Sequence, residues 1–352
     1  MRVCFYSSRV IAATPGGGVS VVRNLADALG ALGVEVALHD YWRDGLAGYD
    51  LIHYFSCDEC EIWPQLAGRG LPLVVTTISW HDWPLWLRAR RRLGFELRAL
   101  RRRTRDRRAS GDPFAFPDHF FPNSRGEATF LRRTHALPPA RMTIIPHGVH
   151  ARFQHGDPRF FVERYGVSDF VLCVGRFESP RKNQLALIRA LQSVHIPVVF
   201  IGGPEVGHEW YYEQCRAAAG PHMHFVPPID HTDALLTSAY HAARVVVLPA
   251  LLESPGLVGL EGAIAGAQVA VTQNGSAQEY LGDLAFYFDP RDPLAMRQAV
   301  LQAYDAKRDD RLRTHVLAHY TWERIAALQH AAYLSVLAAR AQPTPADVPE
   351  AR

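Results

Sequence analysis

Apolar, strand-like runs alternate with amphipathic helical patterns along almost the whole chain, and this alternation constrains the fold more than any other feature. Such alternation is typical of parallel α/β sheets, because parallel strands need a long crossover connection, usually a helix. In the first part of the chain we predict strands over 2–8, 34–40, 50–56, 73–79, 119–124 and 142–147. A second series is predicted over 170–176, 198–203, 224–228, 244–250, 268–273 and 284–290.

The two series of strands predict an α/β chain with two Rossmann-like domains, since 352 residues exceed the size of one comfortable core. The expected domains are 1–150 and 151–321, joined near residues 148–160. A long helical pattern from about Trp322 to Arg340 has no strand after it. We expect the proline-rich tail 341–352 to be disordered.

Composition indicates an ordinary soluble protein, with 48% apolar and 21% charged residues. The five cysteines are scattered and odd in number, which favours reduced thiols in the cytosol over a disulfide framework. No stretch approaches the roughly 20 apolar residues that cross a bilayer, and the first residues are too short an apolar run for a signal peptide. We therefore expect a cytoplasmic protein.

Lysine is rare here: of 38 Lys and Arg residues, only Lys182 and Lys307 are lysine. Lys182 lies in VGRFESPRKNQ, six residues after Arg176 and just past a predicted strand. Open α/β sheets bind ligands beyond their strand ends, where a guanidinium, an ammonium and a helix N-terminus suit a diphosphate. The alternative is a surface loop with two solvated cations. The scarcity of lysine favours the anion site, because arginine replaces it freely only where the charge is solvated.

Two glutamates eight residues apart, Glu253 and Glu261, occur in ESPGLVGLEGA after another predicted strand. Their spacing places Glu253 on a loop at the strand end and Glu261 about one turn into a helix. The N–H groups near Gly256 and Leu257 would lie at the helix N-terminus, available to phosphate oxygens, and a carboxylate suits sugar hydroxyls. Alternatively, Glu261 only favours the positive end of the helix.

These segments together resemble the retaining glycosyltransferases of family 4. VGRFESPRKN is similar to the family's G-R-x5-K-N segment, and Glu253 and Glu261 are similar to its E-x7-E motif. Similar stretches in the family's order are PGGGVSVVRNLADAL, FPNSRGEATFL, IIPHGVHARF and AFYFDPRDP. The resemblance implies the GT-B fold, in which two Rossmann-like domains face a central cleft. It also implies that the C-terminal helix, 322–340, crosses back to the first domain.

The resemblance also implies roles for individual residues. Domain 1–150 would be the acceptor side, and domain 151–321 would bind the nucleotide-sugar donor. Arg176 and Lys182 would bind the distal phosphate, Glu261 the ribose hydroxyls, and Glu253 the donor sugar. The implied catalytic residues are Glu253, His81, Arg176 and Lys182, and the remaining implied donor-binding residues are Ser254, Gly256, Leu257, Gly17 and Gly18.

Two of these implied roles have alternatives or departures. His81 would lie at the donor-sugar pocket, but it would also fit as a packed histidine beside Trp80 and Trp83. The E-x7-E loop of the family has Gly, an aromatic residue and Pro where this chain has Ser254, Pro255 and Val258, so the sugar that it selects stays open.

The chain has no Asp-x-Asp triplet, so we expect no metal and no cofactor, only a nucleotide-diphosphate sugar as co-substrate. Fixed cations would then stabilise the charge that develops on the leaving diphosphate. Cys57 and Cys60 form a single C-x-x-C without the second ligand pair of a structural zinc site, and we interpret both as ordinary thiols.

Residues 88–108 hold 11 arginines against Glu96 and Asp106. Apolar residues recur among them at helical spacing, which predicts an amphipathic helix that could rest on an anionic membrane surface. The alternative is a solvated helix. A nucleic-acid partner is not expected, since no basic sheet with interleaved aromatic residues accompanies the segment.

The sequence therefore predicts a retaining, metal-independent, hexosyltransferase-type glycosyltransferase. Its acceptor would be a surface polysaccharide or a lipid-linked glycan, reached from the cytoplasm or from the inner face of the membrane. The alternatives are a non-catalytic GT-B partner or regulatory protein and a GT-B nucleotide-sugar epimerase. The sequence leaves open the base, the sugar, the acceptor and its linkage, and the oligomeric state.

Overall fold

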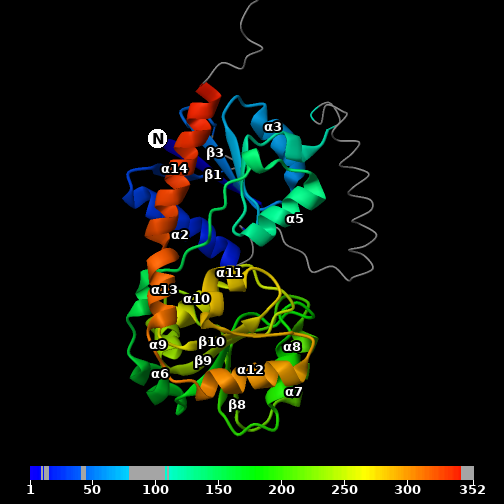
Figure 1. Cartoon of the computed structure of the whole chain (residues 1–352), viewed down its shortest axis with the longest axis vertical. Helices are drawn as coiled ribbons and strands as arrows, with labels where there is room; N and C mark the ends of the chain where they lie inside the picture. The colour runs from blue at the N-terminus through cyan, green and yellow to red at the C-terminus, as the bar shows by residue number, and fades with distance from the viewer. Residues whose placement is uncertain (9–10, 12–15, 41–44, 79–107, 109–110, 342–352) are drawn as a thin grey trace, which may run out of the picture. The chain divides into compact units, whose positions relative to one another are not determined.

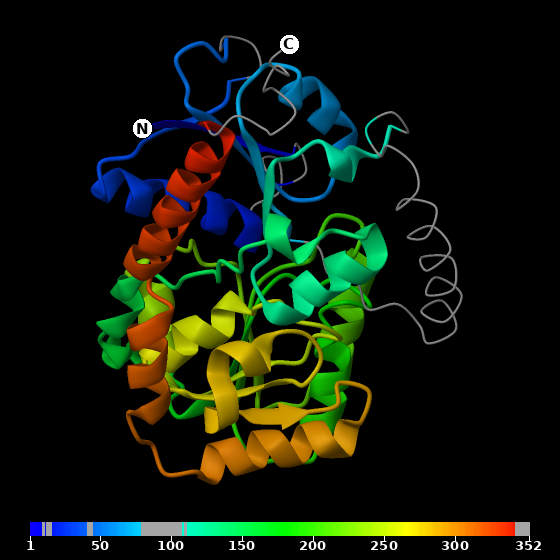
Figure 2. The ribbon, with the colours of Figure 1, turned by 45° about the horizontal axis from the view of Figure 1, so that its top comes forward.

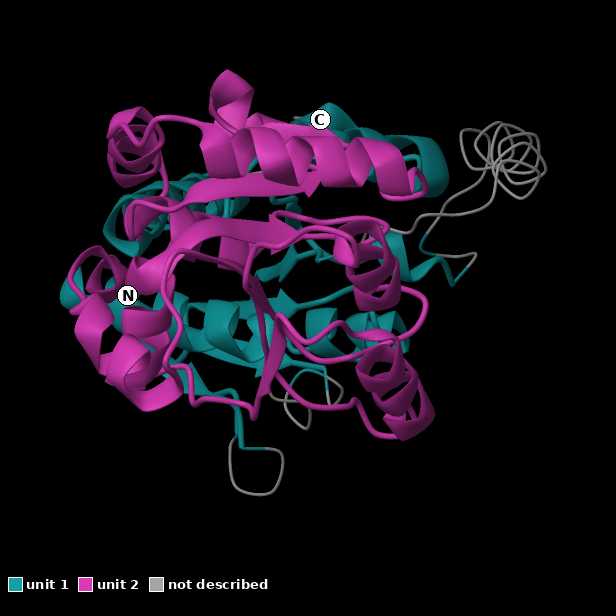
Figure 3. Cartoon of the chain, turned by 90° about the horizontal axis from the view of Figure 1, so that it is seen from below, with its two compact units in different colours: residues 1–148, 322–352 teal, residues 149–321 magenta. Residues whose placement is uncertain are grey.

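The computed structural model describes residues 1–8, 11, 16–40, 45–78, 108 and 111–341. The chain divides into two compact units, Met1–Gly148 with Trp322–Arg352, and Val149–Thr321 (Figure 3). The predicted domain boundaries lie close to this division. The predicted tail 341–352 begins at the last residue of a helix, and 342–352 lie outside the described residues.

Unit 1 contains a five-stranded parallel sheet in the order β2-β1-β3-β4-β5. Its strands are β1 (Arg2–Ser7), β2 (Glu35–Leu38), β3 (Leu51–Phe55), β4 (Leu73–Thr76) and β5 (His119–Phe121). The inner strands β3 and β4 are buried along their whole length, as expected for a parallel sheet with covered faces. The described helices of this unit are α2 (Gly17–Ala31), α3 (Trp63–Ala67), α5 (Arg125–His135) and α14 (Trp322–Ala341).

The last helix, α14, packs against α2 and so returns to unit 1, as the resemblance to the GT-B fold implies (Figure 1). Gly148 allows this return, because a Cβ atom there would lie 2.7 Å from the Trp322 ring. Deeper in the unit, the Tyr333 hydroxyl of α14 contacts His53 Nδ1 on β3 at 2.5 Å. His53 Nε2 contacts the Thr76 hydroxyl at 2.7 Å, so the buried ring joins two strands to the final helix.

Unit 2 contains a six-stranded parallel sheet in the order β11-β10-β9-β6-β7-β8. Its strands are β6 (Phe170–Val174), β7 (Val198–Ile201), β8 (Met223–Val226), β9 (Ala243–Leu248), β10 (Gln268–Thr272) and β11 (Phe286–Phe288). This is the doubly wound strand order, in which the chain starts at the centre, runs to one edge and then fills the other. All predicted strands but one thus lie in two parallel sheets, and the predicted α/β class is confirmed.

Helices cover both faces of this sheet. One buried cluster lies beneath α6 (Pro158–Tyr165), α9 (Ala234–Ala242), α10 (Leu257–Ile264) and α13 (Arg311–His319). The other lies beneath α7 (Gln184–Leu191), α8 (Glu209–Ala218) and α12 (Pro293–Asp305), and Figure 2 shows α12 in orange along its side of the sheet. Two Asp-Pro pairs begin helices here: Asp157 and Asp292 accept backbone N–H bonds, and proline occupies the first helical position.

One predicted strand is wrong. Residues 142–147 form no strand but an extended segment beside β5, with a single bridge between Met142 and Phe120. Thr143 and Ile145 donate backbone hydrogen bonds to the carbonyls of Phe120 and Pro122. Pairing stops there because β5 itself ends at Phe121 and the chain turns into α5 at Arg125.

Across the described residues, no helix combines the length and the apolar character that crossing a bilayer requires.

The pH dependence of stability follows from the buried histidines. Burial lowers the pKa of His53 to about 3 and that of His147 to about 4. In the unfolded chain, histidine takes up a proton near pH 6.5. Between these values only the unfolded state binds the proton, so stability is complete above about pH 6.5 and is lost as the pH falls.

We therefore expect the free energy of unfolding, measured by urea titration, to fall from pH 7 to pH 5, above the range where carboxylates titrate. The variant His53→Gln should start less stable but lose less over the same interval, because one of the buried groups no longer titrates. An identical loss in wild type and variant would contradict a neutral, buried His53.

Candidate active site

The centre of the second sheet defines where its ligand should lie. Strands β6 and β9 are neighbours, and the chain continues from them to opposite edges of the sheet. Open α/β sheets bind ligands beyond the carboxyl ends of the strands at such a reversal. The loop 175–183 follows β6, and the loop 249–256 follows β9. These two loops hold Arg176, Lys182 and Glu253.

The loop after β6 is fixed at both of its ends. A Cβ atom at Gly202, just past β7, would lie 2.1 Å from the Gly175 carbonyl oxygen, so the close approach of these two strand ends requires glycine. Within the loop, the Lys182 N–H group donates to the carbonyl of Glu178 over 2.9 Å. The Gln184 side chain donates to the carbonyl of Arg176 over 2.7 Å.

Asn183 joins this loop to two others. Its backbone has a φ of 58°, in the left-handed region that asparagine tolerates better than most residues. Its side-chain amide donates to the carbonyls of Pro249 and Pro290 over 3.0 and 2.9 Å. These carbonyls follow β9 and β11, so one amide group holds three strand ends together and sets Lys182 beside the loop of Glu253.

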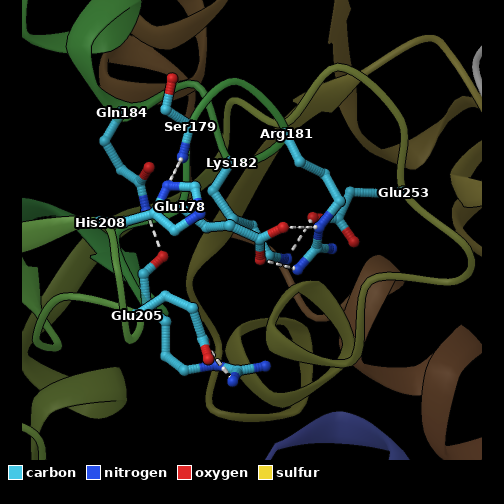
Figure 4. A network of polar contacts seen from close by, with 9 residues as sticks. Glu178, Ser179, Arg181, Lys182, Gln184, Glu205, His208 and Glu253 are labelled. Atoms are coloured by element: carbon cyan, nitrogen blue, oxygen red, sulfur yellow. Dashed lines mark hydrogen bonds and ion pairs between the residues drawn. The ribbon is translucent and has the colours of Figure 1, made fainter. Parts of the chain in front are cut away.

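Lys182 and Glu253 form an ion pair across the strand reversal (Figure 4). The ammonium of Lys182 donates to Glu253 Oε1 over 3.1 Å, and the two side chains are 26% and 12% exposed. Because the pair is mostly buried, salt screens it less than it would screen a pair on the open surface. The structure therefore brings two of the predicted site residues into direct contact.

Two further ion pairs lie beside the first one. Arg176 pairs with Glu205, which follows β7. Arg181 Nε donates to Glu178 Oε1 over 2.8 Å (Figure 4). The hydrogen bond from Arg181 lowers the pKa of Glu178, and the nearby charges of Lys182 and Arg176 lower it further. Three cations are thus close enough to act on one carboxylate.

The six charged groups of these three pairs sum to zero, 3 − 3 = 0. An incoming diphosphate would bring additional negative charge. It would have to share Arg176 and Lys182 with the carboxylates that hold them, and both guanidinium and ammonium groups have several donors with which to do so.

The backbone of Glu253 is held by the loop after β10. Its N–H group donates to the carbonyl of Asn274 over 3.1 Å, and its own carbonyl accepts from the N–H group of Ser276 over 3.0 Å. Between them, Gly275 has a φ of 111°, and a Cβ atom there would lie 1.9 Å from the Glu253 carbonyl oxygen. The Ser276 hydroxyl donates to that of Ser254 over 3.2 Å, which also positions the predicted donor-binding Ser254.

Helix α10 begins directly after this loop. Gly256 precedes its first residue, Leu257, with a φ of 85°, and a Cβ atom at Gly256 would lie 2.8 Å from a methyl carbon of Leu248. The first N–H groups of a helix lack partners within it and favour an anion. Gly256 and Leu257 therefore lie at a helix N-terminus, and their contacts with phosphate stay a prediction.

Glu261 lies further along α10 and belongs to a second cluster. Its side chain is 7% exposed, and its carboxylate contacts His231 Nε2 at 2.7 Å and accepts from the Tyr240 hydroxyl at 2.5 Å. The sequence motif therefore joins two carboxylates with different surroundings. Glu253 faces a cation, whereas Glu261 is held by a ring nitrogen and a hydroxyl.

The remaining predicted site residues belong to unit 1. Gly17 and Gly18 form the first turn of α2 in unit 1, where a Cβ atom at Gly18 would lie 3.3 Å from the side chain of Ile11. His81 falls in 79–107, outside the described residues, as does almost all of the arginine-rich segment 88–108.

Cys57 and Cys60 of the C-x-x-C sequence are both half-buried. Burial, together with the charge of Glu61, raises the pKa of Cys60 to about 11, so this thiol keeps its proton at neutral pH. Within the described part of the chain, no three His, Cys, Asp or Glu side chains gather into a group that could hold a metal ion.

Sequence reasoning missed several residues that shape these clusters. Glu205 follows a Gly-Gly-Pro turn at the next strand end, a position that could have marked it as a candidate. Gly275 lies in an Asn-Gly-Ser turn, which signals a backbone with positive φ. His231 and Tyr240 gave no signal, because only the packing of α9 and of the loop after β8 brings them to Glu261.

Residues 168–306 match the family model described as glycosyl transferases group 1. The D-inositol 3-phosphate glycosyltransferase of Geodermatophilus obscurus is 30% identical over 238 residues, which are 61% of this chain and 52% of that protein. The chain thus spans about half the length of the curated relatives that it matches.

Solved structures extend the similarity over nearly the whole chain. The sucrose-phosphate synthase of Thermosynechococcus elongatus has a TM-score of 0.76 at 20% identity, covering 96% of this chain and 99% of that one. HepE of Anabaena, solved with UDP and glucose, has a TM-score of 0.67 at 16% identity, covering 95% and 99%. The predicted likeness to the GT-B glycosyltransferases is thereby confirmed, and the chain has their fold. The finer assignment to family 4 stays a prediction.

The close approach of Gly275 to Glu253 can be tested by substitution. We expect Gly275→Ala to lower the free energy of unfolding by about 3 kcal/mol or more, since the new methyl group meets backbone that cannot move away cheaply. Gly266→Ala is the matched control: its φ is 88°, with nothing within 4 Å of a Cβ atom, so it should cost only about 1 kcal/mol. Equal losses in urea titrations of the two variants would show that the clash is absent.

Proposed function

We propose that this protein is a glycosyltransferase that moves a sugar from a nucleoside-diphosphate sugar to an acceptor hydroxyl. The observation that carries the proposal is the pairing of Lys182 with Glu253 across the reversal of a doubly wound sheet, next to Arg176. The match to group 1 glycosyltransferases and the UDP bound in the similar HepE structure support it.

In this proposal, Arg176 and Lys182 bind the distal phosphate, and the start of α10 at Gly256 and Leu257 offers N–H groups to the same diphosphate. As the bond between the sugar C1 and the diphosphate oxygen breaks, negative charge grows on that oxygen. Cations already fixed in place stabilise this charge without the reorganisation that solvent would need. Fixed side chains would thus supply the charge that a metal supplies elsewhere, and metal independence is part of the proposal.

The acceptor oxygen forms the new bond to C1 on the face that the diphosphate leaves, and the departing phosphate oxygen takes the acceptor proton. This front-face course retains the configuration at C1 and requires no protein nucleophile. Glu253 and His81 would contact the donor sugar, Ser254 would shape its loop, Glu261 would hold the ribose hydroxyls, and Gly17 and Gly18 would approach the phosphates or the acceptor.

The acceptor belongs to the proposal as well. We propose a surface polysaccharide or lipid-linked glycan, glycosylated in the cytoplasm, with segment 88–108 at the inner face of the membrane. Eleven arginines in this segment would favour an anionic surface by about 1 kcal/mol each where they come close to it.

Donor binding is tested by thermal shift with UDP-, GDP-, ADP- and dTDP-sugars. A ligand that binds only the folded state raises its stability by RT ln(1 + [L]/Kd), so about 2.7 kcal/mol is expected at a hundredfold excess over Kd. We expect one base to raise the melting temperature clearly above the others. No shift with any of them would favour a non-catalytic partner protein, and sugar conversion without acceptor would identify an epimerase.

Lys182 allows a sharp kinetic test because the chain has only one other lysine. With the donor chosen by the panel, Lys182→Ala should lower kcat/KM by roughly a hundredfold or more, the cost of one preorganised charge contact. Lys307→Ala, at an exposed position, should leave nucleoside diphosphate release unchanged. Near-wild-type turnover in Lys182→Ala would remove Lys182 from the mechanism, and with it the main support for the assignment.

A further inference from the structure

Side chains from two other elements hold the carboxylate of Glu261. It lies in the fifth position of α10, and each of its oxygens has a separate partner: His231 at Oε1 and Tyr240 at Oε2. His231 follows β8, and Tyr240 lies on α9, so two further elements converge on one side chain of α10. A carboxylate offers about four lone-pair sites, and these partners occupy two.

The contacts of His231 fix where its proton lies. Its Nδ1 atom faces the guanidinium of Arg152, at 2.5 Å, and the same guanidinium donates to the His231 carbonyl. A guanidinium has only donors, so Nδ1 must accept and the proton must be on Nε2. Nε2 then donates to Glu261. The His231 ring thus links the Arg152 guanidinium to the Glu261 carboxylate, and Arg152 sets its tautomer.

Tyr240 can act on Glu261 only as a donor. It is fully buried, and burial together with the neighbouring Glu261 charge raises its pKa well above the usual value of 10. The hydroxyl therefore keeps its proton at any working pH. The Phe153 ring packs edge-on against both groups, with centroids 5.2 Å from His231 and 5.3 Å from Tyr240, which limits the movement of either donor.

We propose that Arg152, His231 and Tyr240 are positioning residues that lock Glu261 in one orientation, leaving its two remaining lone-pair sites to accept from the vicinal cis-hydroxyls of a ribose. The inference rests on the proposed function, which gives Glu261 the ribose. Two fixed donors prevent the carboxylate from rotating, so a diol meets acceptors that are already aligned.

The prediction is selective weakening of ribose recognition. The probe is the diphosphate among UDP, GDP and ADP that the wild type binds, together with its 2′,3′-dideoxy counterpart. Calorimetry should show that the wild type prefers the ribose form, and that His231→Ala and Tyr240→Phe each weaken its binding about tenfold. The Kd of the dideoxy form should change less than about threefold in both variants.

Matched variants distinguish the loss of the contacts that position Glu261 from a general loss of folded structure. Tyr287→Phe removes a tyrosine hydroxyl of the same unit that donates to the Gly282 carbonyl over 2.6 Å, and it should affect neither probe. His231→Gln keeps one acceptor and one donor and should recover part of the lost preference. If Tyr240→Phe does not fold, the His231 variants carry the test, since that side chain is 36% exposed.

The possible results distinguish failure of the positioning role from failure of the proposed function. Equal weakening of ribose and dideoxy binding would overturn the positioning role and leave only a structural one. Equal wild-type affinity for the two probes would overturn the assignment of Glu261 to the ribose while leaving donor binding intact. Binding of dTDP alone, whose deoxyribose has no vicinal diol, would overturn the inference and leave the proposed function intact. Binding of none of the four nucleoside diphosphates would overturn the proposed function itself, and the inference with it.

Discussion

The side-chain amide of Asn183 holds together the part of the structure on which the candidate site depends. Its two hydrogen bonds reach the carbonyls of Pro249 and Pro290, so the ends of β6, β9 and β11 share one donor group. Parallel strands meet only through hydrogen bonds along their length, and nothing in a sheet fixes the loops beyond it. The two bonds of Asn183 therefore fix the backbone next to Lys182 beside the loop that holds Glu253. The left-handed backbone of Asn183 turns the chain directly into α7, which fixes the angle of the loop as well.

The charged groups around this amide are balanced rather than cationic. Each of Arg176, Arg181 and Lys182 has its own carboxylate, supplied by three different loop positions. Unpaired cations in one cluster would repel one another and would bind small anions without selectivity. Paired cations are held in fixed orientations, and a ligand must compete with the carboxylates for them. Pairing therefore lowers affinity for simple anions and favours a ligand that also makes the sugar, ribose and base contacts.

The sequence predicted what depends on local pattern and missed what depends on the order of strands. Alternation predicted both parallel sheets, and it failed at 142–147 because an apolar extended segment reads as a strand whether or not a neighbour pairs with it. Lys182 and Glu253 could be assigned to one candidate site in advance, since both follow strands and both belong to spaced motifs, but their direct ion pair could not. Glu205 could not be assigned to Arg176, because that pairing requires knowing that β7 lies beside β6. His81 lies outside the described residues, and its role stays a prediction.

The two carboxylates of the E-x7-E segment, Glu253 and Glu261, have different surroundings and are therefore suited to different ligands. Glu253 sits on a loop and faces an ammonium group, a partner that a bound anion can share, so its environment changes when the site fills. Glu261 sits inside a helix and faces two donors whose protons are fixed by chemistry: a hydroxyl that stays protonated and an imidazole oriented by a guanidinium. Its environment is complete before any ligand arrives. In the proposed function, the loop-borne Glu253 would follow a sugar that changes shape during transfer, and the locked Glu261 would hold a ribose that does not.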